Sequence, residues 1–190
     1  MGTLDQLRAE VASCTACGLS QTRTNVVVGA GPLEAPLVLI GEAPGAAEDA
    51  AGEPFVGRSG SLLLKLVDEV LGLGRADCYI ANVIKCRPPS NRPPSRGEIA
   101  SCAPFLDAQL AAVRAAVVVT VGNTASRTVL GTTEGITSLR GSVHRSPRCT
   151  LPVVPTYHPA AALRGGPSVV AAMRDDLALA RPFLDDVGTR

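Results

Sequence analysis

The chain has few aromatic residues, few histidines and almost no lysine, and each shortage narrows what the protein can be. Aromatic side chains make up only 3% of its 190 residues, so the core must be built from valine, leucine, isoleucine and alanine. A ring or a histidine in a loop is then more noteworthy than in an average chain. The formal net charge of +1 is too balanced for a protein that coats nucleic acid without sequence preference.

No basic and apolar leader opens the sequence, and no apolar run approaches the roughly 18 residues that a membrane-spanning helix needs. We therefore expect a cytoplasmic protein that does not enter a membrane. With 46% hydrophobic residues the chain can bury a full core, and its length predicts one domain over residues 1–190. Cys78 and Cys149 border apolar runs and are expected to be small buried hydrophobes.

The other four cysteines are split between two distant places. Cys14 and Cys17 form a C-x-x-C motif, whereas Cys86 and Cys102 follow in and beyond a proline-rich stretch. In the cytosol such cysteines indicate metal ligands or core thiols rather than disulfides. Four thiolates can bind zinc or an iron–sulfur cluster, and the long first gap argues against a local zinc ribbon. Such a site would tie the N-terminal segment to a loop in mid-chain.

Four short apolar runs predict strands, with helical patterns between them. The strands are expected at Leu37–Ile40, Tyr79–Ile84, Val117–Val121 and Val153–Thr156. The helices are expected at Leu4–Val11, Ser61–Leu71, Gly97–Val113, Thr124–Leu130 and Ser168–Leu184. This alternation predicts a mostly parallel sheet covered by helices on both faces.

Unusual residues follow each of the four predicted strands. The motifs are GEAPG at 41–45, NVIKCRPP at 82–89, GN at 122–123 and YHP at 157–159. Since ligands of open parallel sheets bind outside the carboxyl ends of the strands, the four motifs predict one site.

The loop after the first predicted strand is dense in glycine and proline, which fixes a rigid backbone that a ligand can approach closely. Phe55 lies in this loop, where its ring either stacks on a planar base or plugs the loop over the sheet. Ser59 and Gly60 either offer free amides to a phosphate, or Ser59 is a plain N-cap. His158 follows the last strand and could hydrogen-bond to an anion that leaves the crevice. His144 lies in a loop and receives no role.

The motifs GEAPG, G-x-PFVG-x-SG, NVIKCRPP-x-NRPP and HP followed by LR occur, with the four cysteines, in one order from Cys14 to Arg164. In this set and order the chain resembles the family 4 uracil-DNA glycosylases, the iron–sulfur branch of their superfamily. The resemblance implies an α/β fold, namely a three-layer α/β/α sandwich with a central four-stranded, mostly parallel sheet. It implies a 4Fe-4S cluster held by Cys14, Cys17, Cys86 and Cys102. It also implies an enzyme that flips uracil out of DNA and hydrolyses its N-glycosidic bond, leaving an abasic site for base excision repair.

Residue roles follow from the same resemblance. Phe55 is expected to stack on the flipped uracil. Asn82 is expected to hydrogen-bond to the base edge, since its amide offers a donor beside an acceptor. His158 is expected to stabilise the departing base. Glu42 lies in the water-activating loop, and Glu48 matches another functionally important glutamate of the family.

Three positions depart from the patterns of the superfamily. Ala43 stands where the prototype branch has an aspartate as general base, so we expect positioning of the water rather than its deprotonation. The carbonyl of Glu42, or the carboxylate of Glu42 or Glu48, would hold that water. Gly45 replaces the tyrosine that excludes thymine in the prototype branch. Ala160 stands at a position where relatives often have serine.

Leu163 and Arg164, which follow the last motif, are expected to wedge into the base stack behind the flipped nucleotide. The expected substrate-binding set is Gly41, Ala43, Gly45, Phe55, Ser59, Asn82, Leu163 and Arg164. The expected partner is uracil-containing DNA, single- or double-stranded, bound by a monomer.

Four alternatives stay open on sequence alone. A family 5 glycosylase with a broader range of damaged bases resembles this chain but starts its loop with an apolar residue where Glu42 stands. A homologue that traps uracil-DNA covalently needs a histidine in an inserted basic loop, and the loop RPPSNRPPSRGE has none. A non-catalytic homologue is disfavoured by the intact Glu42, Asn82 and His158. Zinc could replace the cluster, since both take four thiolates.

Overall fold

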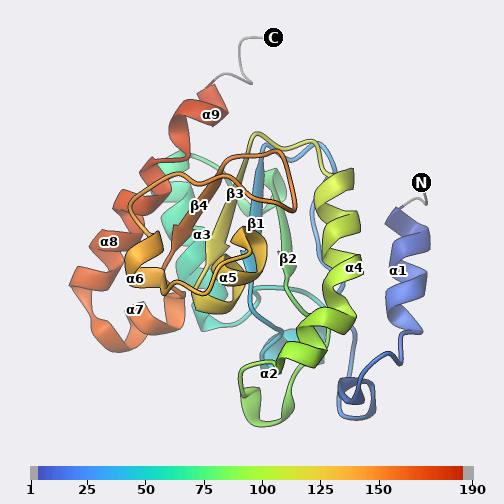
Figure 1. Cartoon of the computed structure of the whole chain (residues 1–190). Helices are drawn as coiled ribbons and strands as arrows, with labels where there is room; N and C mark the ends of the chain where they lie inside the picture. Colours follow the sequence, from blue (N-terminus) through green and yellow to red (C-terminus); the bar gives the residue numbers. More distant parts are fainter. Residues whose placement is uncertain (1–3, 186–190) are drawn as a thin grey trace.

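The computed structural model describes residues 4–185, and Figure 1 shows their arrangement. The strands are β1 (Leu37–Gly41), β2 (Cys78–Asn82), β3 (Val117–Val121) and β4 (Val153–Thr156). The α-helices are α1 (Leu4–Ala12), α2 (Ala46–Ala51), α3 (Arg58–Leu71), α4 (Arg96–Ala112), α5 (Asn123–Leu130), α6 (Ile136–Leu139), α7 (Pro159–Gly165), α8 (Pro167–Ala178) and α9 (Arg181–Asp185). Short 3₁₀ helices are η1 (Gly18–Gln21), η2 (Arg75–Asp77) and η3 (Pro89–Asn91). Within residues 4–185 no helix has the length and apolar character needed to cross a membrane.

The central sheet has four strands in the order β2-β1-β3-β4, and all of its pairs are parallel. Every residue of these strands is buried, so helices must cover both faces, as all-parallel sheets require. In Figure 1, α2 and α7, which follow β1 and β4, lie at the lower side of the view. The predicted α/β fold on a four-stranded sheet is confirmed, and the sheet is wholly parallel.

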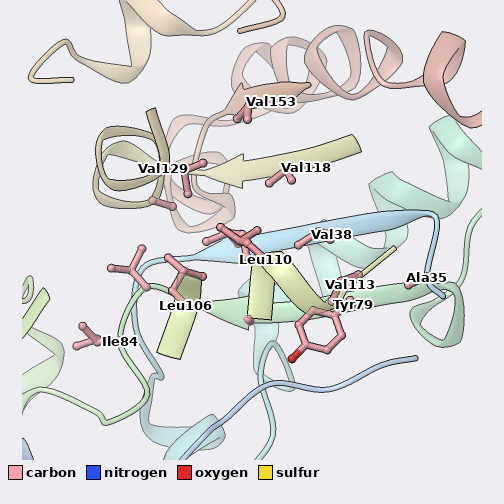
Figure 2. Close-up of a cluster of buried hydrophobic side chains, with 14 of the residues drawn as sticks. Ala35, Val38, Tyr79, Ile84, Leu106, Leu110, Val113, Val118, Val129 and Val153 are labelled. Atoms are coloured by element: carbon pink, nitrogen blue, oxygen red, sulfur yellow. The ribbon is translucent and has the colours of Figure 1, made fainter. Parts of the chain in front are cut away.

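Alternate residues of each strand pack into different cores, because successive side chains of a strand point to opposite faces. On one face Leu39 packs with Leu63 of α3 and Met173 of α8. On the other face Val38 packs with Leu106 of α4, in the cluster that Figure 2 shows. The sheet is therefore the middle layer of three.

Two predicted boundaries are wrong. The strand predicted at Tyr79–Ile84 ends at Asn82, because the two apolar residues that follow are buried without belonging to the sheet. The helix predicted at Ser168–Leu184 breaks after Ala178, four residues before Pro182. A proline ring clashes with the carbonyl four residues earlier and provides no N–H. The other predicted elements agree with the observed ones to within a few residues.

The two cysteines expected to be buried differ in their surroundings. Cys78 is fully buried, and burial raises the pKa of its thiol to about 12, so the thiol stays protonated at neutral pH. Cys149 packs against the core but is only partly buried, so the expectation of full burial is wrong for this residue.

A buried carboxylate connects α8 to the end of β4. Asp176 is fully buried and accepts hydrogen bonds from Thr156 Oγ1 at 2.8 Å and from the Gly141 amide at 3.0 Å. Arg140 binds both carboxylate oxygens, at 2.9 and 3.0 Å. The same guanidinium lies 5.2 Å from the ring centroid of Tyr157. This network fixes the turn that follows β4.

Replacing Asp176 by alanine should lower the free energy of unfolding by about 3–5 kcal/mol, because it leaves the Arg140 charge without its buried partner. Asp175→Ala alters the neighbouring, exposed residue and should change that free energy by less than about 0.5 kcal/mol. Urea unfolding of both variants and the wild type measures the difference. Equal midpoints for the two variants would contradict the role given to this network.

Candidate functional site

A cleft of about 800 Å³ opens at the carboxyl edge of the sheet. It brings together residues from the ends of β1 and β2, from α2 and α3, and from the turn after β4. Ten expected site residues line it: Glu42, Ala43, Gly45, Glu48, Phe55, Ser59, Asn82, His158, Leu163 and Arg164. Gly41 is the eleventh expected residue, and it lies at the end of β1 beside the cleft.

The innermost part of the cleft depends on Gly41, which has no side chain. Gly41 pairs in register with Asn82 across β1 and β2. A Cβ atom on Gly41 would lie 2.6 Å from Phe55 Cζ and would also overlap Asn82 Oδ1. The glycine therefore lets the ring and the amide close over the same strand end. Asn82 is 3% exposed, and within the described residues nothing hydrogen-bonds to its side-chain amide, which remains available to a ligand.

Phe55 is held in a backbone conformation that side chains rarely adopt. Its φ is +54°, and its ring is 6% exposed. From outside the loop, Arg75 donates to the carbonyl of Pro54 at 2.8 Å and to that of Phe55 at 3.4 Å. Non-glycine residues in this region occur where the surrounding structure enforces them, often at functional sites. The ring both covers the end of β1 and forms one wall of the cleft.

Glu48 joins two loops through backbone amides. Its Oε2 accepts from the Gly45 amide and its Oε1 from the Gly57 amide, both at 3.1 Å. A Cβ atom on Gly45 would lie 2.7 Å from Glu48 Oε2, so a larger residue here would require the Glu48 carboxylate to shift. Gly57 is the N-cap of α3, so the alternative that Ser59 is the N-cap is wrong. Ser59 instead lies in the first turn of α3 and faces the cleft.

Glu42 has a partner that sequence reasoning missed. Thr124, in the first turn of α5, donates its hydroxyl to Glu42 Oε2. The main-chain carbonyl of Glu42 accepts the Ile84 amide at 3.2 Å. One carboxylate oxygen and the carbonyl thus each have a partner, whereas Oε1 has no hydrogen bond within the described residues. The motif at 122–123 lies beside Thr124 in sequence. The helical pattern alone could not show that the Thr124 hydroxyl binds Glu42 at the end of β1.

His158 is the N-cap of α7, and its Nδ1 accepts the Ala160 amide at 3.2 Å. An Nδ1 that accepts carries no proton, so the neutral ring bears its proton on Nε2 and donates from there. Burial lowers the pKa of His158 below its usual 6.5, with Glu42 and Glu48 opposing and Arg164 assisting the shift. The neutral imidazole is therefore the form at neutral pH.

The rim of the cleft carries one exposed apolar side chain and several arginines. Leu163 is 54% exposed, the largest fraction among the exposed large apolar side chains of the described residues, and Arg164 follows it. Arg58 and Arg92 also line the cleft. Arg92 pairs with Glu98 at 2.6 Å, and this hydrogen bond holds the pKa of Glu98 at about 2.

The four cysteines expected to bind metal line a second pocket, separate from the cleft. Cys14 and Cys17 line it from the segment between α1 and η1, Cys86 from the loop after β2 and Cys102 from α4. Within residues 4–185, no three cysteine, histidine or carboxylate side chains lie close enough to ligate one metal ion.

Two cations also line this thiol pocket. Arg23 donates to Cys86 Sγ at 3.2 Å and to the carbonyl of Cys14 at 2.9 Å. Lys85 is the second cation that lines the pocket. Burial lowers its pKa to about 8, so its charged form still prevails at neutral pH. Burial raises the pKa of the Cys86 and Cys102 thiols, against the opposing influence of Arg23 and Lys85. The pocket is thus built to offset negative charge.

Comparison with known proteins shows the family to which the chain belongs. The model of the Uracil DNA glycosylase superfamily matches residues 28–178. The Type-4 uracil-DNA glycosylase of Thermotoga maritima is 44% identical over 183 residues, which cover 94% of this chain and 93% of the relative. That of Sulfurisphaera tokodaii is 43% identical over 169 residues, or 86% of this chain and 77% of the relative. The Type-5 uracil-DNA glycosylase of Pyrobaculum aerophilum is 33% identical over 114 residues, only 53% of this chain and 50% of that protein.

The influence of neighbouring charges on the pKa of His158 can be tested by NMR titration. His144, which pairs with Val153 at the amino end of β4, serves as internal reference. Glu42→Gln should lower the pKa of His158 further, because the carboxylate favours the imidazolium. Arg164→Gln should raise it, because the guanidinium disfavours the imidazolium. Shifts of the same sign in both variants would show that these neighbours do not control the ring.

Proposed function

Because the chain belongs to the uracil-DNA glycosylase superfamily, and within it to the type-4 enzymes, we infer that it removes uracil from DNA. It hydrolyses the N-glycosidic bond, releases uracil and leaves an abasic site for repair. The supporting observation is the convergence of Phe55, Asn82 and His158 on one cleft. They come from the loop after β1, the end of β2 and the turn after β4.

We propose that the cleft binds the uracil after it has been flipped out of the base stack, since a base inside a duplex is out of reach. Phe55 supplies a flat wall for stacking. The Asn82 amide offers one donor and one acceptor, which match a carbonyl and the imide N–H of uracil. Cytosine has an amino group in place of that carbonyl, so the same amide would meet an unmatched donor.

His158 acts on the leaving group. As the glycosidic bond breaks, negative charge collects on the base, including the carbonyl oxygen beside the glycosidic nitrogen. A neutral imidazole that donates from Nε2 strengthens its hydrogen bond as this charge grows, and it therefore stabilises the transition state more than the ground state. The amide of Ala160 supports this role by occupying Nδ1.

Glu42 positions the attacking water. Thr124 holds one of its carboxylate oxygens, and the other is left for the water. The contacts of Glu48 favour a supporting role, because both of its oxygens bind loop amides. Ala43 adds no carboxylate, so this cleft relies on holding the water and stabilising the departing anion rather than on a strong base.

The rim would hold the DNA around the flipped nucleotide. Leu163 is exposed enough to fill the gap left in the base stack, with Arg164 next to it. The first-turn amides of α3 at Ser59 and Gly60 face the cleft and suit a phosphate. Ala160 offers no hydroxyl and its amide already binds His158, so phosphate contacts fall mainly to α3 and the rim arginines.

We propose that the thiol pocket holds a 4Fe-4S cluster through Cys14, Cys17, Cys86 and Cys102. The similarity to type-4 enzymes, which form the iron–sulfur branch of the superfamily, favours a cluster over zinc. Bound there, it would supply a cross-link rather than chemistry at the base. Iron and sulfide analysis, with absorbance near roughly 400 nm, tests the assignment.

The remaining expectations follow from this function. We propose that the chain forms one glycosylase domain, built on a single sheet that carries the cleft, and that it acts as a monomer. Its substrate is cellular DNA, single- or double-stranded, so we expect it to work in the cytoplasm. A type-5 activity is less well supported, because that similarity covers about half of the chain and Glu42 stands where type-5 enzymes have an apolar residue.

Release of uracil from labelled DNA, followed on a gel, tests the function and the role of Asn82 together. Asn82→Asp should slow excision by roughly 100-fold or more, because a carboxylate offers no donor to uracil and repels its anion. Asn91→Asp makes the same chemical change at the exposed rim and should have little effect. Equal losses in the two variants would mean that negative charge near the DNA, and not base recognition, explains the result.

The division between leaving-group and water-positioning residues can be tested with single-turnover kinetics. His158→Ala should slow excision by about 10²–10³-fold, the scale of one lost transition-state donor. A 5-fluorouracil base carries negative charge more easily, so it should restore the rate of His158→Ala more than that of Glu42→Ala or Thr124→Val. Thr128→Val, one turn further along α5, serves as control. Equal restoration in all variants would contradict the division.

A further inference from the structure

Lys85 is the largest side chain that is fully buried in the described residues. Its Nζ donates to the main-chain carbonyl of Asn82 at 2.5 Å and to Gln109 Oε1 at 2.6 Å. No carboxylate within residues 4–185 forms an ion pair with it. A buried charge that meets only neutral acceptors costs folding free energy, so an apolar side chain of this length would fill the space more favourably.

The acceptors of Lys85 are themselves fixed. Gln109 is 1% exposed, and its Nε2 donates to the carbonyl of Val28 at 2.6 Å. This bond fixes the orientation of the amide, so Oε1 must face Lys85. The Asn82 carbonyl belongs to the last residue of β2, whose side chain faces the cleft. The lysine therefore holds the backbone of the residue proposed to recognise the base.

Lys85 also lies beside the thiols. It lines the thiol pocket together with Cys102 and directly precedes Cys86 in the chain. Four thiolates outweigh the positive charge of a 4Fe-4S core, so a bound cluster is an anion. Arg23 lies against the same thiols but is partly exposed, which makes Lys85 the fully buried cation of the pocket.

We propose that Lys85 is a positioning residue that couples the thiol pocket to base recognition. Its charge offsets the anionic cluster, and its hydrogen bond holds the Asn82 carbonyl at the end of β2. The inference rests on the proposed cluster and assigns a function to a residue outside both the thiol ligands and the cleft. Through Lys85, the presence of the cluster would affect how the Asn82 amide meets the uracil edge.

The first test measures the cluster without any assay of activity. Lys85→Met keeps the length of the side chain and removes its charge, and Lys85→Gln keeps a donor. Both should lose their visible absorbance in air with a chelator about 10- to 100-fold faster than the wild type, the usual effect of losing an outer-shell partner. Lys65→Met removes the only other lysine, which is exposed on α3, and should bleach like the wild type.

The second test measures coupling to Asn82. Lys85→Met should slow single-turnover excision about tenfold in the wild-type background but cause no further loss in an Asn82→Ala background. Lys85→Gln should excise faster than Lys85→Met, because it can still donate to the carbonyl. If Lys85→Met does not fold, Lys85→Gln supplies both measurements. A lysine that only supported the fold would give additive losses.

The outcomes distinguish a failure of the proposed cluster from a failure of the role proposed for Lys85. A wild-type protein that contains no iron would overturn the cluster and this inference with it. An iron-loaded wild type whose Lys85 variants bleach no faster, or lose excision additively with Asn82→Ala, would overturn the inference alone. Faster bleaching combined with non-additive excision supports it.

Discussion

The parallel pairing of β1 with β2, with Gly41 opposite Asn82, is the constraint on which the rest of the site depends. Because the strands are parallel and in register, they end side by side, and their following loops start from one edge. The bare backbone of Gly41 then admits the ring of Phe55 above the Asn82 amide. A shift of register by one residue would turn Asn82 to the other face of the sheet and separate it from the cleft.

The sheet, its helical cover and most of the cleft were predictable, because buried strands and glycine-rich loops leave strong local patterns. The boundaries that failed did so for tertiary reasons. Val83 and Ile84, the two residues after Asn82, are apolar because they pack into the core, although they lie beyond the end of the strand. Thr124 and Arg75 were missed because their partners, Glu42 and the Phe55 loop, are distant in sequence. No local pattern records such contacts, and nothing in the spacing showed that Gly57 rather than Ser59 begins α3.

Two kinds of support surround the cleft. Backbone amides hold Glu48, and backbone carbonyls hold Arg75, so the loop after β1 is rigid before any ligand arrives. A site that is already organised loses little free energy to ordering when the transition state forms. On the opposite side the buried Asp176 network fixes the turn that carries His158. The loop after β1 and the turn that carries His158 are therefore held in place by separate parts of the fold.

The pairing of Arg92 with Glu98 has a consequence for how this rim meets a polyanion. Glu98 also accepts the Ser95 amide at 2.7 Å and so retains a partner if Arg92 turns to a phosphate. An arginine paired with a carboxylate brings less net positive charge to the phosphates, so binding releases fewer of the cations condensed on the DNA. The logarithm of DNA affinity should therefore fall less steeply with the logarithm of salt concentration than the number of rim arginines alone suggests. A salt titration of Glu98→Gln against the wild type, with the variant steeper, shows the difference directly.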